Sequence, residues 1–429
     1  MPKPSAEAIR TAVKVDLNTP AWEQPQLHNR WHPDIPFSWL HLRVLTAVQC
    51  KVQPGEVVNV ECLDWTGGQI GNNDSADDIK YCDLSRIHYL SGPIEVEGAE
   101  PGDVLVVEIQ DVQPLPEQPW GYCAIFDKNN GGGFLDSHFP NAAKAIWDFE
   151  GIFCSSRHIP GVRFPGLIHP GIMGCMPSQE LLDTWNEREK ELVGYHASIG
   201  TDRVVANLPL EKFTHAGSAD ADSAAKVAKE GARTIPPREH GGNCDIKNLS
   251  RGSKSYLPVY VEGAGLSIGD LHFSQGDGEI SFCGAIEMAG VITIKCEIIK
   301  NGVKDMCMKN PMYIPGPVEP HYGPSRYLTF EGLSVDETGK QHYLDVNVAY
   351  KQTCLQFIEY FKKFGYSGEQ LYILLSCAPV QGHIAAIVDI PNACTTLGVP
   401  VDIFEFECLP KEGGFEKIIT SDCAFTSGK

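Results

Sequence analysis

Short runs that alternate apolar and polar residues recur along the chain, each next to a turn rich in glycine, proline or acidic residues. Val57–Cys62 follows Gly55-Glu56, and Val104–Ile109 follows Gly102-Asp103. Such alternation predicts strands with one buried face. With 42 glycines and 30 prolines in 429 residues, turns are frequent. The pattern therefore predicts a β-rich α+β fold with a few peripheral helices.

One unit of this pattern occurs twice. Pro93–Asp103 and Pro258–Asp270 both read as a strand, a Val-Glu-Gly-Ala turn, a Gly-Asp turn and the start of another strand. Self-similarity of this kind indicates an internal β repeat. Ile280–Ile299, dense in β-branched residues towards its end, predicts one or two further strands.

Helical patterns are confined to a few segments. Gln179–Val193 has helical composition with Ser178 as N-cap, and Ala349–Phe364 is amphipathic. Ser367 and Gln370 have the spacing of a capping box, which predicts a helix through Leu375.

The polar stretch Ser218–Arg233 predicts either a surface helix or a flexible excursion. We use it to divide the chain into an N-terminal β-rich part (1–217), a linker or lid (218–238) and a C-terminal part (239–429). A single interwoven domain is equally compatible with the length.

Charge and cysteine usage narrow the class of protein. Asp and Glu number 55 against 35 Lys and Arg, a net charge of −20, which disfavours nucleic acid and anionic membranes as partners. Fifteen cysteines are scattered without a CxxC pair, as expected of reduced thiols. No apolar leader or membrane span is evident, so the sequence predicts a soluble, cytoplasmic protein.

Candidate chemistry is concentrated between His240 and Glu287. His240-Gly-Gly-Asn-Cys-Asp245 is followed by Gly269-Asp-Leu-His-Phe-Ser-Gln-Gly-Asp-Gly-Glu279. If a strand leaves a Gly269-Asp270 turn, alternation directs Asp270, His272 and Ser274 to one face, with Leu271 and Phe273 towards the core. Imidazole and carboxylate groups are ligands for a divalent ion such as zinc. No HExxH motif is present, and the alternative is that these acids are turn residues and His240 a loop histidine.

Other candidates are isolated. Asp64 ends a strand beside glycines, where active-site acids are often found. His88 and His169 are candidates to bind or donate protons, and the alternative for each is a structural histidine. Cysteine nucleophiles are a separate possibility, and the candidates are Cys154, Cys175 and Cys244. The sequence has no GxSxG elbow and no P-loop, which disfavours serine-hydrolase and nucleotide chemistry.

The GDxHxxQGDGE string and the HGGNCD loop resemble the acetamidase/formamidase family, and most of all its fungal formamidases. The resemblance spans nearly the whole chain. It is carried also by His28–Pro36, Asp64 with Gly68–Ile70, Asp83–His88, Gly92–Ile94 with Glu97–Asp103, His169–Ile172 and Leu375–Ala378. It implies hydrolysis of formamide to formate and ammonia, a homo-oligomer, and an acetamidase/formamidase-like fold. Phe37–Cys50 departs from the pattern and is several residues longer than expected.

Amide hydrolysis requires an activated water, stabilisation of an oxyanion and a proton for the departing nitrogen. We expect a divalent cation, zinc, held by ligands among His240, Asp245, His272 and Asp277. The expected acid and base groups are Asp64, Glu279 and Asp270, and the expected substrate-binding amides are Gln275 and Asn243.

Three alternatives stay open. The chain could prefer acetamide or another short-chain amide, it could use a cysteine nucleophile without metal, or it could be an oligomer whose acidic cluster holds a cation for stability alone.

Overall fold

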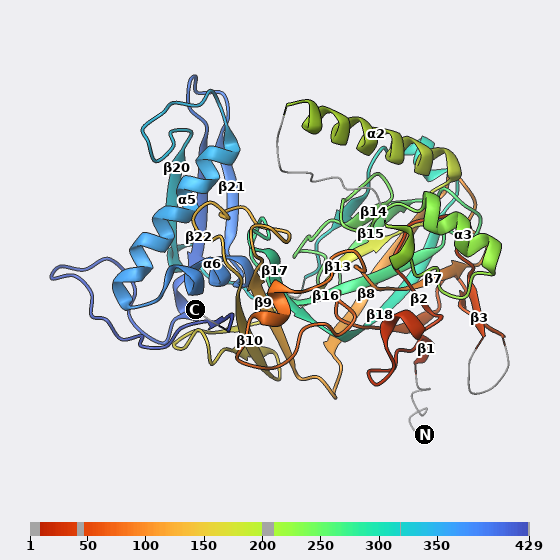
Figure 1. Cartoon of the computed structure of the whole chain (residues 1–429), viewed down its shortest axis with the longest axis horizontal. Helices are drawn as coiled ribbons and strands as arrows, with labels where there is room; N and C mark the ends of the chain where they lie inside the picture. The colour runs from red at the N-terminus through yellow and green to blue at the C-terminus, as the bar shows by residue number, and fades with distance from the viewer. Residues whose placement is uncertain (1–8, 41–46, 200–209, 318, 428–429) are drawn as a thin grey trace, which may run out of the picture.

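Two large β-sheets form the body of the protein in the computed structural model, which describes residues 9–40, 47–199, 210–317 and 319–427 (Figure 1). The strands are β1 (Arg10–Val13), β2 (Leu27–His28), β3 (Ser38–Leu40), β4 (Ala47–Gln49), β5 (Lys51–Val52), β6 (Val57–Cys62), β7 (Leu90–Val96), β8 (Val104–Pro114), β9 (Trp120–Ile125), β10 (Ala143–Glu150), β11 (Phe153–Ser155), β12 (Arg163–Pro165), β13 (His169–Gly174), β14 (Gly241–Asn243), β15 (Lys254–Pro258), β16 (Leu266–Gln275), β17 (Phe282–Met288), β18 (Gly290–Ile299), β19 (Met312–Ile314), β20 (Tyr327–Leu333), β21 (Gln381–Ala386), β22 (Cys394–Pro400) and β23 (Ala424–Phe425). The helices are α1 (Asp77–Lys80), α2 (Gln179–Ser198), α3 (Ala221–Glu230), α4 (Gly302–Asp305), α5 (Val346–Phe361) and α6 (Gly368–Cys377), with short 3-10 turns at Ala21–Glu23, Glu211–Phe213, Pro324–Arg326, Lys362–Phe364 and Val401–Ile403. The predicted β-rich class with few helices is confirmed.

The six-stranded sheet combines distant parts of the sequence. Its order is β1-β6-β18-β8-β15-β19, so β18 from residues 239–429 lies between β6 and β8 from residues 1–217, and β8 lies between β18 and β15. The twelve-stranded sheet also takes strands from both parts. The two parts therefore share one framework rather than lying side by side.

The two similar segments seen in the sequence pair with each other. β8 pairs antiparallel with β15, and β7 with β16, while backbone hydrogen bonds join the turns between them, from Val96 N to Gly263 O and from Val259 N to Asp103 O. β8 and β15 belong to the six-stranded sheet, and β7 and β16 to the twelve-stranded sheet. The turns of the repeat therefore connect the two large sheets.

The central strands of the twelve-stranded sheet run in the order β9-β17-β16-β13-β14. Every residue of β16 is buried, and Leu271 and Phe273 lie in the main hydrophobic core as predicted. Phe273 stacks on Phe149 with ring centroids 4.0 Å apart. Gly269 and Asp270 lie inside this strand rather than at the turn expected from the sequence, because β16 begins at Leu266.

A three-stranded sheet of order β20-β22-β21 carries α5 and lies beside the main sheets (Figure 1). α6 connects it to the body by packing on β17 and β9. The predicted capping box is present, since Ser367 Oγ accepts from Gln370 N and Gln370 Oε1 accepts from Ser367 N.

Three other segments named in the sequence analysis are described by the structure, the third of them in part. α2 begins after Ser178, whose side chain accepts from Leu181 N as predicted, and it continues five residues beyond the predicted end to Ser198. Residues 218–238 contain α3, and Val227 packs with Trp31 and Trp185 in a buried cluster, so this segment is attached to the body. Phe37–Cys50 contains the β3–β4 hairpin, and its residues 41–46 lie outside the described residues. No helix in the described part of the chain is long and apolar enough to cross a membrane.

Candidate active site

Three neighbouring strands converge on His272. The register of the sheet sets it opposite His169 of β13 and Glu287 of β17. Its ring is fully buried, with Nδ1 3.1 Å from Gln275 Oε1. Nε2 lies 3.0 Å from Glu287 Oε2 and 3.3 Å from Asp270 Oδ1. One edge of the imidazole therefore faces an amide and the other faces two carboxylates.

A possible cation site is formed by Asp245, Asp270 and His272, whose ligand atoms all lie within 4.8 Å of one another. Asp245 Oδ1 is buried without a hydrogen bond, and His272 Nε2 and Glu287 Oε2, which face each other at 3.0 Å, are buried without a hydrogen bond of good geometry. Buried polar atoms are costly to leave unpaired, and these belong to residue types that bind divalent ions. The donor set therefore fits a divalent cation.

Gly171 of β13 provides the space at this cluster. A Cβ at this position would lie 2.6 Å from Asp270 Oδ2, 2.6 Å from His272 Cε1 and 2.7 Å from Asp245 Oδ1. Its carbonyl oxygen accepts hydrogen bonds from Cys244 N and Asp245 N, each 3.2 Å away. This single glycine both leaves room among the ligand atoms and holds the loop that carries Asp245.

Three acids of the site share a rare backbone conformation. Asp245, Asp270 and Glu279 have φ values of 49°, 55° and 45°. Non-glycine residues enter this left-handed region at a cost, and they cluster there at functional sites. The carboxylates are therefore directed by the backbone as well as by side-chain rotation.

Burial and neighbouring charges shift the pKa values of the residues in this cluster. Burial, followed by the charge of Asp270, raises the pKa of Asp245 to about 7, and burial raises the pKa of Glu287 to about 8. Although burial alone disfavours a charged ring, Glu287 and Asp270 hold the pKa of His272 well above its usual value. The acidic groups outnumber the imidazole, which again favours a bound cation.

Glu279 stands next to this group. Burial, followed by repulsion from Asp245 and Glu287, raises its pKa well above the usual value, and it shares a hydrogen bond with Asp245. Its Oε1 also accepts from Gly284 N at 3.3 Å. The position suits a group that moves a proton beside the cluster.

A cavity of about 1240 Å³ opens onto these residues. Asn243, Asp245, Asp270, Gln275, Glu279 and Glu287 line it on the side of the cluster. Aromatic and aliphatic side chains line other parts, among them Trp65, Phe134, Ile280 and Phe282. The predicted site residues of the two motifs therefore meet largely around one cavity.

Gln275 acts mainly on other site residues. Its Nε2 donates to the carbonyl oxygen of Asp245 at 2.5 Å, and its Oε1 lies 2.9 Å from His169 Nε2. Asn243 is placed differently, because its Nδ2 donates to Ile235 O while its Oδ1 is buried without a hydrogen bond. Of the two predicted substrate-binding amides, Asn243 retains a free acceptor.

The structure does not bring His240 and Asp277 into the Asp245, Asp270 and His272 group. The His240 ring is enclosed by Trp31 and Trp185, at centroid distances of 4.5 and 4.6 Å. Asp277 pairs instead with Lys247, and the two atoms, Oδ1 and Nζ, are 3.0 Å apart. His240 and Asp277 are therefore near Asp245 and Glu279 in sequence but do not share their site.

Asp64 also has its oxygens occupied. Oδ1 accepts from Thr66 N, Thr66 Oγ1 and the Tyr122 hydroxyl, and Oδ2 accepts from Gly68 N. This pattern organises the turn after β6. His88 lines the cavity, but its Nδ1 lies 2.9 Å from Thr234 Oγ1.

Two residues of the site, Glu287 and Gly171, are assigned no role from the sequence. Glu287 is the only charged residue of β17, which otherwise reads Phe-Cys-Gly-Ala-Ile and Met. A lone acid in an apolar strand is a signal that could have identified it. Gly171 carries no such signal, because its role depends on contacts across the sheet.

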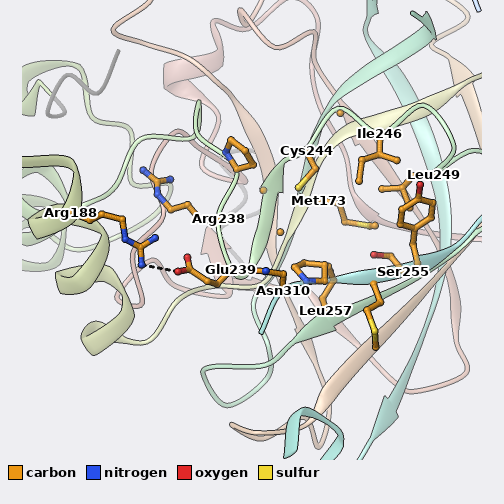
Figure 2. Close-up of a pocket in the computed structure, with 17 residues that line it drawn as sticks. Met173, Arg188, Arg238, Glu239, Cys244, Ile246, Leu249, Ser255, Leu257 and Asn310 are labelled. Atoms are coloured by element: carbon orange, nitrogen blue, oxygen red, sulfur yellow. Dashed lines mark hydrogen bonds and ion pairs between the residues drawn. The ribbon is translucent and has the colours of Figure 1, made fainter. Parts of the chain in front are cut away.

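A second cavity, of about 450 Å³, lies behind the loop that carries Asp245 (Figure 2). Met173, Ile246, Leu249 and Leu257 make much of its wall, while the ion pair between Arg188 and Glu239 lies at one end. Gly171 lines it too, and Cys244 lines both cavities. Only a thin layer of residues therefore separates it from the cluster.

The cysteine candidates have raised pKa values. Cys154 and Cys175 are buried in the main core, and burial raises the pKa of both thiols above the usual range. Burial, followed by the charge of Asp245, raises the pKa of Cys244 to about 11. Nucleophilic cysteines require thiolate, so none of the three is activated.

Buried carboxylates and an imidazole grouped at a cavity wall, on a framework of paired sheets, are typical of a hydrolase centre. The chain belongs to the Acetamidase/Formamidase family, whose model matches residues 14–406. The resemblance inferred from the motifs is thereby confirmed.

Relatives cover nearly the full length. A candidate formamidase of Schizosaccharomyces pombe is 68% identical over 98% of this chain and 100% of its own, and a formamidase of Methylophilus methylotrophus is 56% identical over the same shares. An acetamidase of Mycolicibacterium smegmatis is 52% identical over 84% of this chain and 87% of its own. Among solved structures, a gamma lactamase from Delftia acidovorans superposes with a TM-score of 0.92 at 55% identity, covering 98% of this chain and 100% of its own.

Proposed function

We propose that the protein is a formamidase, which hydrolyses formamide to formate and ammonia. The observation that carries this proposal is the group of Asp245, Asp270 and His272 at the wall of the cavity, in a chain with two full-length formamidase relatives. The net charge of −20 is consistent with a neutral amide as substrate.

Asp245, Asp270 and His272 would hold a divalent cation, with Glu287 beside it. We propose zinc, because mixed imidazole and carboxylate ligation is common for zinc in hydrolases. When bound, the cation supplies Lewis acidity and lowers the pKa of a water molecule. His240 and Asp277 are no longer part of this ligand set.

The chain's own residues supply the remaining chemistry. Glu279 moves a proton between the attacking water and the departing nitrogen, a role supported by its place beside Asp245. Asn243 Oδ1 accepts a hydrogen bond from the amide nitrogen of the substrate, since this atom is buried and unpartnered. Gln275 positions His272 and the Asp245 loop. Asp270 serves as a ligand rather than as the base.

A second substrate class is favoured by the dimensions of the cavity. About 1240 Å³ with partly apolar walls greatly exceeds the needs of formamide. The Delftia acidovorans neighbour is named a gamma lactamase, so a cyclic amide is the second candidate, ahead of acetamide.

We further propose a homo-oligomer in the cytoplasm. Ile384, Ile387, Val388 and Ile390, on β21 and the loop after it, are 59%, 48%, 74% and 68% exposed, an apolar surface suited to a second copy. All fifteen cysteines are free, as in a reducing compartment.

The decisive experiment measures ammonia release from formamide and acetamide, and ring opening of a γ-lactam to its amino acid, by one purified sample, with metal analysis of the same sample. We expect the highest kcat/KM with formamide and about one divalent ion per chain. Absence of hydrolysis of all three amides would refute the proposed function. Activity that survives chelation and is lost on thiol alkylation would instead support the cysteine alternative.

A further inference from the structure

Arg30 is a buried cation without an acidic partner among the described residues. The residue is 1% exposed, and no carboxylate forms an ion pair with it. The guanidinium hydrogen-bonds instead to backbone carbonyls, from Nη1 to Asn29 O at 2.7 Å and from Nη2 to Ser85 O and Leu210 O at 3.4 Å each. A charge removed from water in this way normally has a counter-ion.

The Arg30 side chain lines the large cavity that also contains the cluster. Its Nε is buried without a hydrogen bond, and the Nη2 contacts are long. Arg233 lines the same cavity, and its Nε is also unpartnered, although its Nη2 lies 3.5 Å from Glu189. Burial, followed by the charge of Arg233, lowers the pKa of Arg30 to about 10, which reflects two cations near one another with too little negative charge.

We propose that Arg30 forms a carboxylate-binding subsite of this cavity. A guanidinium has five N–H donors in a planar fork that matches the two oxygens of a carboxylate. The backbone carbonyls hold the fork in place through its Nη atoms, while Nε and part of Nη2 remain available to an anion. Such an anion would restore the missing negative charge.

The ligand is a small carboxylate, and two sources supply that chemistry. Formate is the product of the proposed reaction, so identifying it as the ligand rests on the proposed function. An amide that itself carries a carboxylate, such as oxamate, is the other source. The subsite itself depends only on the burial of Arg30 and its position in the cavity.

The test is calorimetric binding of formate and oxamate to the full-length protein with its native metal content, against chloride at equal ionic strength. We expect saturable binding of at least one carboxylate, weakened about tenfold or more in Arg30→Gln and less in Arg30→Lys. Arg163→Gln is the control, because the Arg163 side chain is 42% exposed and Arg163 is not among the residues that line the cavity. The carboxylate affinity of this variant should equal that of the unaltered protein. Tighter binding of formate identifies the product as the ligand, and tighter binding of oxamate identifies an anionic amide.

Equal affinity in Arg30→Gln and the unaltered protein would overturn the proposal. If the Arg30 variants fold poorly, a crystal of the unaltered protein containing bromide, located by anomalous scattering, replaces them. Bromide beside Arg30 supports the subsite. Bromide found only at other positions refutes it. Binding that depends on Arg30 in a protein that releases no ammonia would remove the proposed function and leave the subsite standing.

Discussion

Lys247 Nζ lies 3.0 Å from Asp277 Oδ1, and this ion pair joins two segments that carry site acids. Lys247 follows Asp245 by two residues, and Asp277 precedes Glu279 by two. Asp277 Oδ2 also accepts from Gly382 N at 2.9 Å, at the start of β21. The pair therefore connects the site to the C-terminal sheet.

Asp277→Asn is expected to lower kcat more than it raises KM, because it loosens the placement of Asp245 and Glu279. Loss of the pair leaves Lys247 buried with only Val380 O as partner, so stability should fall by about 1–3 kcal/mol. Steady-state kinetics and urea unfolding measure both. Unchanged kcat and KM in this variant would show that the pair does not position the two acids.

Gly171→Ala is expected to abolish activity and reduce metal content, because the new Cβ would enter the space among Asp245, Asp270 and His272. Gly194→Ala is the control. Gly194 lies in α2, where a Cβ would meet nothing within 4 Å, and alanine should stabilise the helix by about 0.5–1 kcal/mol. Metal analysis with an ammonia assay checks both variants, and an active Gly171→Ala enzyme would contradict the assigned site.

His272→Ala and His240→Leu should separate the two motif histidines. His272→Ala is expected to lose metal and activity while remaining folded. His240→Leu keeps a similar volume between Trp31 and Trp185, so it should retain metal and cost less than about 2 kcal/mol. Metal loss from His240→Leu would restore His240 to the ligand set.

Glu279→Gln should affect mainly the turnover rate, whereas Asp64→Asn should affect mainly stability. Without a proton carrier, kcat of Glu279→Gln should fall by about 10²- to 10⁴-fold, with little change in melting temperature. Asp64→Asn should instead destabilise the protein by about 1–3 kcal/mol, because one oxygen that accepts from Thr66 or Gly68 becomes a donor. Tyr122→Phe, which removes one hydrogen bond to Asp64, should show a smaller effect of the same kind.

Chelation of the cation should remove activity and lower the melting temperature, because a ligand that binds only the folded state stabilises it. The acids of the cluster then repel one another without compensation. Activity should return on adding back the native ion. An unchanged melting temperature after verified metal removal would argue against a cation at this cluster.

The elements with local signals were predictable from the sequence. Ser178 and the Ser367–Gln370 pair mark helix starts, because each serine side chain accepts from a backbone N–H only three positions later. The alternation around Leu271 and Phe273 predicts which side chains are buried. The family resemblance was also readable from the sequence, because it rests on contiguous motifs. The match to the family model confirms it.

Cross-strand contacts could not be predicted in the same way. Glu287 meets His272 only because β17 pairs with β16 in one register, and Gly171 meets the cluster only through β13. His240 belongs to the cluster of histidines and acids in the sequence, yet its ring packs between Trp31 and Trp185. Sequence distance is a poor guide where a sheet edge intervenes.

Asp245, Asp270 and Glu279 hold left-handed backbone angles that glycine would adopt without penalty. A search for more thermostable variants that ignores turnover would therefore reward replacing Glu279, which is not among the proposed cation ligands. Selection for heat resistance alone would move the enzyme towards a sturdier but inert protein, and any engineering programme on this chain needs a catalytic screen at every round.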